Sequence, residues 1–422
     1  MTDIEKQTTY KAAIADGFYQ RNTGGLNGKY DNVRRYWEDQ ITRYVLHDFI
    51  GDFVEEKRQS LTRIRVLDLG CGAGEGYEIL TNPSQQTLCL ATKEVDVMPS
   101  EMLGYYKGID ISEAMVEQGR KTYNDSPKMT FCVGDLSEGL STAADDCPYD
   151  IYFSSYGSLA HLKDDELRRL VVEICDHFQD RCVFVADMLG CYSYEWQCYW
   201  TEPGADETNM RQYSMSYLYP PEMIDQIEVE RFPMRYWGGE EFDRFISEIA
   251  AELGVKIVRR ELNDRSIVVG RHMDTAEYNP HAQPLRDVVN QLHEFNCRTD
   301  LQGLIFDYLP HADHPGLNTF FEQFQMAWNA VIYTCIEAIE HWGNGEWQAP
   351  EIPAEYPDVL KEAVHTIRDV IRNLKWFRMG DPLANIVEPQ LGYILRNLEQ
   401  DLQKGLGAGH GLLAVYEFSK SP

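Results

Sequence analysis

Short apolar runs alternate with longer amphipathic stretches between residues 64 and 272, which is the pattern of alternating strands and helices. The run Ile64–Leu69 predicts the first strand. Later runs predict strands at 105–110, 129–133, 149–153, 182–187, 255–261 and 266–271. Only Leu262-Asn-Asp-Arg265 separates the last two, and a turn this short suits an antiparallel hairpin. The pattern therefore predicts an α/β fold with an antiparallel last strand.

The two ends of the chain have helical periodicity instead. Within residues 1–60, Ile41, Val45, Leu46 and Phe49 are spaced for one apolar helix face. Beyond residue 274 the helical pattern recurs at 285–295, 320–342, 359–377 and 386–402, and a strand is expected at 412–418. We therefore expect an N-terminal helical segment (1–60), an α/β domain (61–273) and a mainly helical C-terminal domain (274–422).

A glycine-rich turn, Asp68-Leu-Gly70-Cys71-Gly72-Ala-Gly74, follows the first predicted strand. Glycine allows positive φ and lets a ligand lie against the backbone. A dinucleotide site would need a third glycine five positions after the first, where this chain has Glu75. This turn also lacks the Lys-Ser or Lys-Thr pair of a phosphate-binding P-loop. The turn therefore indicates a nucleoside site that does not hold a pyrophosphate.

This turn closely resembles motif I of the class I S-adenosylmethionine (SAM) dependent methyltransferases. In that family the glycine loop runs under the amino-acid end of SAM. The resemblance covers residues 30–272 and implies a Rossmann-like seven-stranded sheet with an antiparallel last strand. It also implies SAM as cofactor, S-adenosylhomocysteine (SAH) as product, and residues 1–60 as a helical lid over the pocket of a 61–273 SAM-binding domain. The cofactor-binding residues it implies here are Asp68, Gly70, Cys71, Gly72 and Gly74.

Two acids after the next strands suit the nucleoside. Asp110 ends the second predicted strand, where a carboxylate accepts from both ribose hydroxyls, and Ile111 and Met115 follow near the adenine. Asp96, within an insertion at 81–102, is the less favoured alternative. Asp135 lies in Gly134-Asp135-Leu136, which resembles the family motif that receives the adenine amino group.

The loop after the fourth strand, Ser154-Ser-Tyr-Gly-Ser-Leu-Ala-His161, is expected to face the transferred methyl group. It resembles the corresponding loop of glycine and amino-sugar N-methyltransferases. We assign Ser154 to the cofactor, Ser158 to the substrate, and catalytic roles to Tyr156 and His161. A second interpretation makes His161 a cap of the helix expected at 164–178.

Aromatic residues are unusually dense at 191–200 and 213–219, within an insertion at about 190–237. Aromatic faces suit cations and sulfonium-like transition states. Tyr192, Trp196 and Tyr217 are therefore expected to wall the substrate pocket. An aromatic core beneath a lid is the alternative.

Charge and composition narrow the partners. The formal charge is −29, from 39 basic and 68 acidic residues, which argues against nucleic acid or an anionic membrane surface as partner. A signal-peptide core, a membrane-spanning apolar run and C-x-x-C pairs are all missing, so we expect a cytoplasmic protein with reduced cysteines. His311 and His314 have a spacing open to metal, but without a Cys or Glu cluster no metal site is expected.

These features together predict a SAM-dependent methyltransferase of a small molecule, with N-methylation of an amine favoured. An amine needs only to arrive neutral, whereas a hydroxyl needs a base or a metal. Transfer to the oxygen of a phenol, hydroxyl or carboxylate remains an alternative, and an aminopropyl transferase or a non-catalytic SAM-binding scaffold is less favoured. The C-terminal domain is left with two roles, a homodimer interface or a cover over the substrate.

Overall fold

The computed structural model describes residues 30–81, 97–140, 143, 145–200, 210–219, 221–342, 349–378 and 380–420. The alternative acid Asp96, most of the 81–102 insertion and the first part of the 1–60 segment lie outside these ranges. The cysteines within them are free thiols.

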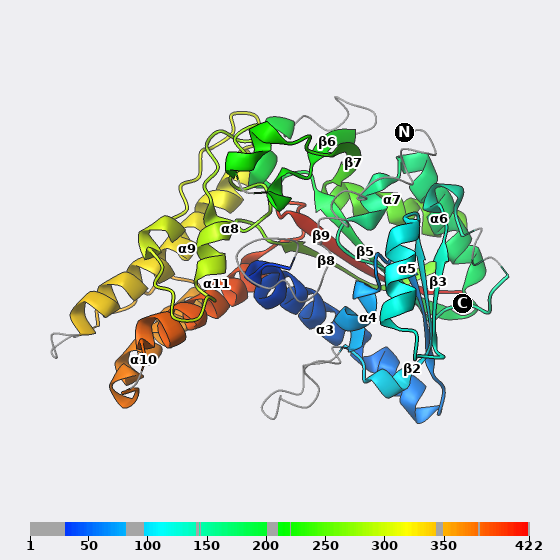
Figure 1. The fold of residues 1–422 in the computed structure, drawn as a ribbon, viewed down its shortest axis with the longest axis horizontal. Helices are drawn as coiled ribbons and strands as arrows, with labels where there is room; N and C mark the ends of the chain where they lie inside the picture. The colour runs from blue at the N-terminus through cyan, green and yellow to red at the C-terminus, as the bar shows by residue number, and fades with distance from the viewer. Residues whose placement is uncertain are drawn as a thin grey trace.

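A mixed sheet forms the centre of the molecule (Figure 1). Its main strands lie in the order β3-β2-β1-β4-β5-β9-β8, and β7 and β6 extend one end of β5. Their bounds are β1 Ile64–Leu69, β2 Leu103–Asp110, β3 Met129–Val133, β4 Ile151–Ser154, β5 Arg181–Gly190, β6 Met210–Ser214, β7 Arg231–Trp237, β8 Lys256–Arg265 and β9 Gly411–Ser419. Strand β9 is antiparallel to both β5 and β8, so the predicted α/β sheet with an antiparallel last strand is confirmed.

The identity of that antiparallel strand was predicted wrongly. Strand β8 runs on through Arg265, so the expected turn at 262–265 lies inside it, and 266–271 is not a strand. The apolar run Ile267–Val269 is buried, but it packs between the sheet and the helices beyond it. The strand expected at 412–418 is β9 and belongs to the sheet. The division at residue 274 is therefore wrong for this strand, and the rest of the domain division stays a prediction.

Helices cover both faces of the sheet (Figure 1). Along β5, Val183 and Val185 pack on the face that α3 (Asp39–Gln59) covers, and Phe184 and Ala186 pack on the other. The remaining helices beside the sheet are α4 Glu75–Thr81, α5 Glu113–Thr122, α6 Asp164–His177 and α7 Gly239–Glu252. This alternation is the period-two pattern of a strand that is buried on both faces.

Four further helices form an arm beside the sheet (Figure 1). They are α8 Leu285–Gln291, α9 Pro315–Trp342, α10 Asp358–Arg372 and α11 Glu388–Leu402, close to the predicted ranges. The arm shares a core with the sheet, since Trp37 lies 5.9 Å from Trp328 between ring centroids. Glu399 of α11 accepts hydrogen bonds of 2.8 Å from the Trp37 indole and from the backbone N–H groups of Ser266 and Ile267. One buried carboxyl group therefore joins the N-terminal helix, the end of β8 and the arm.

Candidate functional site

The glycine turn is held tightly by its neighbours. The backbone N–H groups of Gly70 and Cys71 both donate to the carbonyl of Ile109 on β2, at 2.8 and 3.0 Å. Gly70 has φ +76°, and a Cβ there would come within 2.4 Å of the Ser158 Cβ. The Ser158 hydroxyl in turn donates to the Gly70 carbonyl at 2.9 Å. Only glycine fits this position, where the turn meets the loop that follows β4.

Two carboxylates lie at the same edge of the sheet because β2 and β3 are parallel neighbours. Asp110 accepts from the Gly72 N–H at 2.8 Å through one oxygen and from the Ser112 N–H at 2.9 Å through the other. Asp135 accepts from the Ser137 N–H at 2.9 Å. The two side chains are therefore fixed in place by backbone donors.

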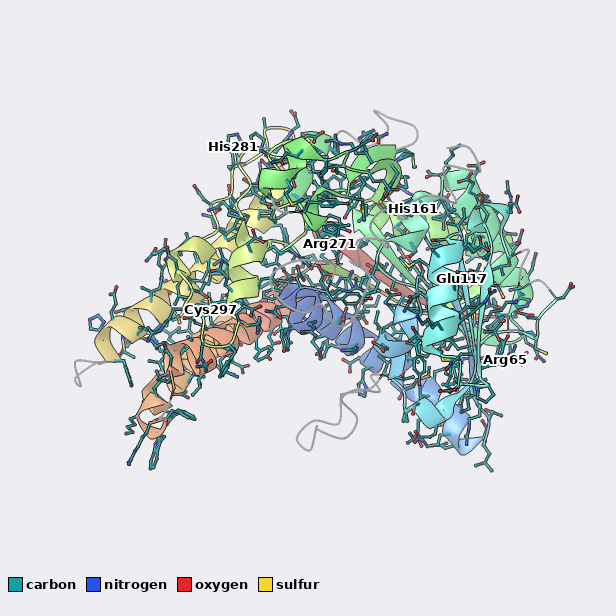
Figure 2. The ribbon with its side chains drawn as sticks, viewed as in Figure 1. Arg65, Glu117, His161, Arg271, His281 and Cys297 are labelled. Carbon is teal, nitrogen blue, oxygen red and sulfur yellow. The ribbon has the colours of Figure 1, made fainter. Side chains whose placement is uncertain are left out.

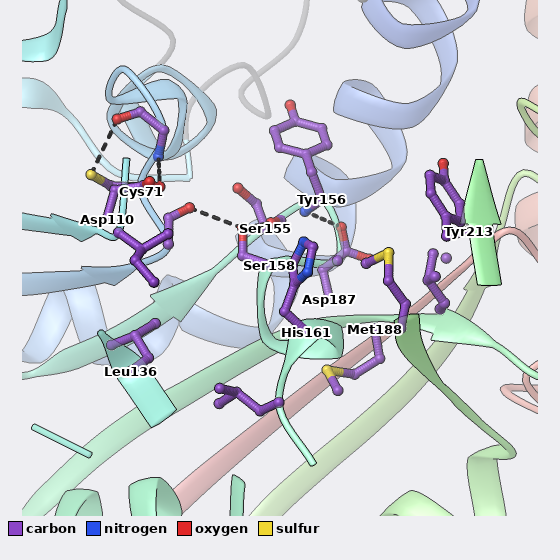
Figure 3. Close-up of a pocket in the computed structure, with 18 of the residues that line it drawn as sticks. Cys71, Asp110, Leu136, Ser155, Tyr156, Ser158, His161, Asp187, Met188 and Tyr213 are labelled. Atoms are coloured by element: carbon purple, nitrogen blue, oxygen red, sulfur yellow. Dashed lines mark hydrogen bonds between the residues drawn. The ribbon is translucent and has the colours of Figure 1, made fainter. Parts of the chain in front are cut away.

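A cavity of about 350 Å³ lies over these ends of the strands. Figure 3 shows its lining from Cys71 and Asp110 on one side, past Ser158 and His161, to Tyr213 on the other. It brings together most of the predicted site residues: Gly70, Cys71, Gly72, Asp110, Ile111, Met115, Gly134, Asp135, Leu136, Tyr156, Ser158, His161 and Tyr217.

Three predicted cofactor residues do not line the cavity. Asp68 is fully buried beneath the turn, where it accepts from the Tyr106 hydroxyl, and burial raises its pKa to about 8. Gly74 packs against the ring of Tyr123. Ser154 points into the core, and it is Ser155, next along the chain, that reaches the cavity. These positions support the turn and the strand end from behind.

The first aromatic cluster is core and not pocket wall, so the predictions for Tyr192 and Trp196 are wrong. The indole of Trp196 is fully buried and donates to the Gly190 carbonyl at 2.8 Å, with its ring 4.8 Å from that of Tyr236. Tyr192 packs against Trp200, with 6.4 Å between ring centroids. The cavity wall comes from the second cluster instead, through Tyr213 and Tyr217.

Tyr156 adopts a strained conformation in the loop after β4, with φ +56°. Its N–H donates to Asp187 at 2.6 Å and its hydroxyl donates to Asp39 at 2.5 Å. Burial raises the pKa of this phenol above its ordinary value, so it stays protonated at neutral pH. Tyr156 is therefore a hydrogen-bond donor here and cannot serve as a base.

His161 lines the cavity one turn further along, with its ring 4.9 Å from that of Phe232. It does not cap the next helix, because α6 begins after Lys163, whose N–H donates to Glu166 at 2.9 Å. Burial lowers the pKa of His161 to about 4, so its imidazole is neutral at pH 7. A neutral imidazole can accept a hydrogen bond from a bound molecule.

The middle of the chain matches a known protein family. Residues 98–180, which contain β2, β3, β4 and the loop with His161, match the family model of a methyltransferase domain. The chain carries a SAM-dependent methyltransferase domain. A search of curated proteins returned no match to the sequence.

Solved structures similar to this methyltransferase are distant. A magnesium protoporphyrin IX methyltransferase from Synechocystis PCC 6803 with bound SAH is 14% identical, with 62% of this chain and 92% of that chain covered and a TM-score of 0.35. The glycopeptide N-methyltransferase MtfA is 16% identical, with 51% and 82% covered and a TM-score of 0.31. A SAM-dependent methyltransferase from Clostridium acetobutylicum is 15% identical, with 51% and 82% covered and a TM-score of 0.32. With TM-scores this low, the likenesses carry no argument about the acceptor.

The described ranges of the chain contain neither a membrane-spanning helix nor a group of metal ligands. No helix in those ranges is long and apolar enough to cross a bilayer. Within the same ranges, no three His, Cys, Asp or Glu side chains cluster closely enough to hold a metal ion.

Several cavity residues of the methyltransferase were missed from the sequence. Asp187 of β5 lines the cavity and pairs with Arg265 at 2.8 Å, but no described residue hydrogen-bonds to its second oxygen, Oδ1. Its position at the end of the strand predicted at 182–187 was the signal in the sequence that could have identified Asp187. Methionines that the sequence analysis did not assign form much of the remaining wall: Met188, Met210, Met215 and Met234. Their flexible side chains suit a pocket that adapts to its contents.

A buried charge cluster closes the far end of the cavity. Glu38 accepts from Arg271 at 3.1 Å and from Arg286 at 2.7 Å, and these two arginines hold the pKa of Glu38 well below its usual range. Arg286 also pairs with Asp31 at 2.6 Å. Arg271 lies near the middle of the molecule, between the sheet and the helical arm (Figure 2). This cluster could not be predicted from local sequence patterns, because its members come from segments far apart in the chain.

Proposed function

We propose that the protein transfers the methyl group of SAM to the nitrogen of a small amine. The observation that carries this proposal is the unpartnered Oδ1 of Asp187, a buried carboxylate oxygen beside the cavity. A buried carboxylate oxygen without a partner is costly, so it calls for a donor from a bound molecule. An amine N–H is such a donor, and the neutral imidazole of His161 lines the same cavity.

The cavity also fits SAM. The adenine amino group only donates, which suits the carboxylate of Asp135. The ribose hydroxyls suit the carboxylate of Asp110, which backbone N–H groups of Gly72 and Ser112 hold in place. The glycine turn lines the same cavity through Gly70, Cys71 and Gly72, where the amino-acid end would lie.

Bound SAM would supply a methyl group on a positively charged sulfur that is open to in-line attack. The residues of this chain hold the acceptor and exclude water, which is the main contribution that a protein can make to such a transfer. Asp187 and His161 would accept the N–H groups of the acceptor and direct its lone pair. The faces of Tyr213 and Tyr217 would stabilise positive charge as it passes to the nitrogen.

The pKa of His161 favours nitrogen over a hydroxyl. A hydroxyl acceptor must lose its proton during attack, and a base works best when its pKa is near the operating pH. An imidazole whose pKa is about 4 is a poor match for that task. It is sufficient for an amine, which needs only to arrive neutral and be oriented. A carboxylate acceptor also needs no base, so the pKa of His161 does not distinguish it from an amine. The labelling experiment below distinguishes the two.

The test uses SAM with a labelled methyl group, mixed with the protein, a metabolite extract and a panel of small amines. The labelled product is then treated with mild base. Label that survives in a basic product, and forms at least tenfold more slowly when His161→Gln protein is used, supports N-methylation. Label released as methanol would instead identify a carboxyl acceptor, and label in a neutral ether would identify a hydroxyl.

A further inference from the structure

Arg34 is a buried cation that none of the described residues hydrogen-bonds. It lies in a helical turn, Arg34–Glu38, that leads into α3, and its side chain is 0% exposed. Its Nε, Nη1 and Nη2 atoms all lack hydrogen-bond partners in the described structure. Arg34 nevertheless belongs to the lining of the cavity. A buried guanidinium normally has its fork of N–H donors paired, so this one requires an explanation.

The neighbours of Arg34 supply charge stabilisation but no acceptor. Its Cζ lies 3.7 Å from the centroid of the Tyr156 ring and 4.5 Å from that of Tyr30. Such cation–π contacts favour the charge, but the N–H groups lie in the guanidinium plane and point elsewhere. The nearest carboxylate oxygen is Asp39 Oδ1, at 3.9 Å, and it already accepts from the Tyr156 hydroxyl.

The other acids at this end of the cavity are also engaged. Glu38 is held by Arg271 and Arg286. Glu75 accepts from the Tyr30 hydroxyl at 2.6 Å and from the Ala73 N–H at 2.9 Å. Among the described residues, Arg34 is therefore a preformed cation without a hydrogen-bond acceptor. A planar anion with two oxygens is the partner that its fork matches.

The position of Arg34 identifies which end of the ligand it meets. Tyr30 connects it to Glu75, the first residue of α4 after the glycine turn. Tyr156 connects it to the loop that Ser158 joins to Gly70. Both contacts lead to the glycine turn, and neither involves Asp135, the residue that we assign to the adenine. Arg34 therefore lies where the amino-acid end of SAM would be expected.

We propose that Arg34 binds a carboxylate, and that this carboxylate belongs to the amino-acid end of SAM. The inference rests on the proposed function. The acceptor is the other possible source of the same chemical group, and the experiment separates the two sources.

The experiment compares two ligands by calorimetry. One is SAH. The other is 5′-deoxy-5′-(3-aminopropylthio)adenosine, which keeps the adenine, ribose, thioether and amine but lacks the carboxylate. Both are titrated into the wild type and into Arg34→Met, Arg34→Lys and Arg35→Met proteins. Arg35 is the matched control because it is adjacent and exposed.

We expect Arg34→Met to weaken SAH binding about 10- to 100-fold, the usual effect of removing a charged hydrogen-bonding partner. The decarboxylated ligand should bind the variant and the wild type equally, and Arg35→Met should change neither affinity. Arg34→Lys keeps the charge without the fork, so its loss should be intermediate. The Arg34→Lys variant also keeps the inference testable if Arg34→Met does not fold.

Three results would overturn the inference. If both ligands weaken equally in Arg34→Met, the residue supports the fold and not a carboxylate. If SAH affinity is unchanged while methyl transfer to the acceptor is lost, the carboxylate belongs to the acceptor. If the wild type binds neither ligand, the proposed function fails together with this inference, whereas in the first two results the cofactor assignment survives.

Discussion

Asp110→Asn is the sharpest test of the nucleoside half of the site. The substitution keeps the shape of the side chain but replaces one oxygen with an NH₂ group. Asp110 now accepts from the N–H groups of Gly72 and Ser112, one through each oxygen. The amide nitrogen would therefore face a backbone donor, and it could no longer accept from a ribose hydroxyl.

The expected magnitude follows from the bonds that are lost. Hydrogen bonds to a charged group are worth about 1.5–3 kcal/mol each, and those to a neutral group about 1 kcal/mol. Losing one charged ribose bond and weakening the second gives about 2–3 kcal/mol. At about 1.4 kcal/mol per tenfold, this corresponds to a 30- to 150-fold weaker affinity for SAH.

Calorimetry with the two ligands used for Arg34 gives a distinct signature. Both ligands carry the ribose, so Asp110→Asn should weaken both equally, in contrast to Arg34→Met. Glu113→Gln is the control, because Glu113 is a nearby exposed acid at the start of α5. An SAH affinity within about threefold of wild type would remove Asp110 from the ribose site. If the variant is so destabilised that unfolding explains the whole loss of SAH affinity, Asp110 only holds the glycine turn. A lower melting temperature would reveal this.

Three further measurements address catalysis, stability and the turn. His161→Gln should lower the rate of methyl transfer at least tenfold while the calorimetric affinity for SAH stays unchanged. Burial raises the pKa of Glu399 from 4.5 to about 7, so the folded state keeps a proton that the unfolded chain releases. The free energy of unfolding should therefore fall by about 3 kcal/mol as the pH rises from about 4.5 to 7. Glu399→Gln should flatten that slope in urea unfolding. Gly70→Ala should lower the melting temperature and abolish SAH binding, because the new Cβ collides with Ser158. The control Gly51→Ala lies in open space within α3 and should stabilise the folded protein by about 0.5–1 kcal/mol.

The glycine turn and its two acids could be found from the sequence because their chemistry is local. Each lies within a few residues of a strand end, and parallel strands bring such ends to one edge of a sheet. Gly70, Asp110 and Asp135 therefore reach the same cavity as expected. The loop with Tyr156 and His161 was found in the same way, although burial and not position sets the pKa of His161.

The errors concern features that depend on contacts between distant parts of the chain. The run Ile267–Val269 has the composition of a strand, yet the place beside β8 is taken by β9, which lies about 140 residues later. Both segments are apolar and buried, so no local signal separates them. Trp196 and Tyr217 are likewise both aromatic and close in sequence, and only the packing of β6 and β7 decides which one faces the cavity.

This topology also explains where acceptor recognition would be built. The helical arm is inserted between β8 and β9, two paired neighbours in one sheet, and is not appended after the last strand. The segment that leaves β8 therefore passes the open ends of the strands and carries Arg271 and Arg286 to the cavity end, where they meet Glu38 from the N-terminal helix. These residues lie outside the matched region 98–180. The matched region provides the acids assigned to the nucleoside, and the segments outside it provide the charged groups at the far end of the cavity. Differences in acceptor among proteins with this domain should therefore follow the segments that flank it.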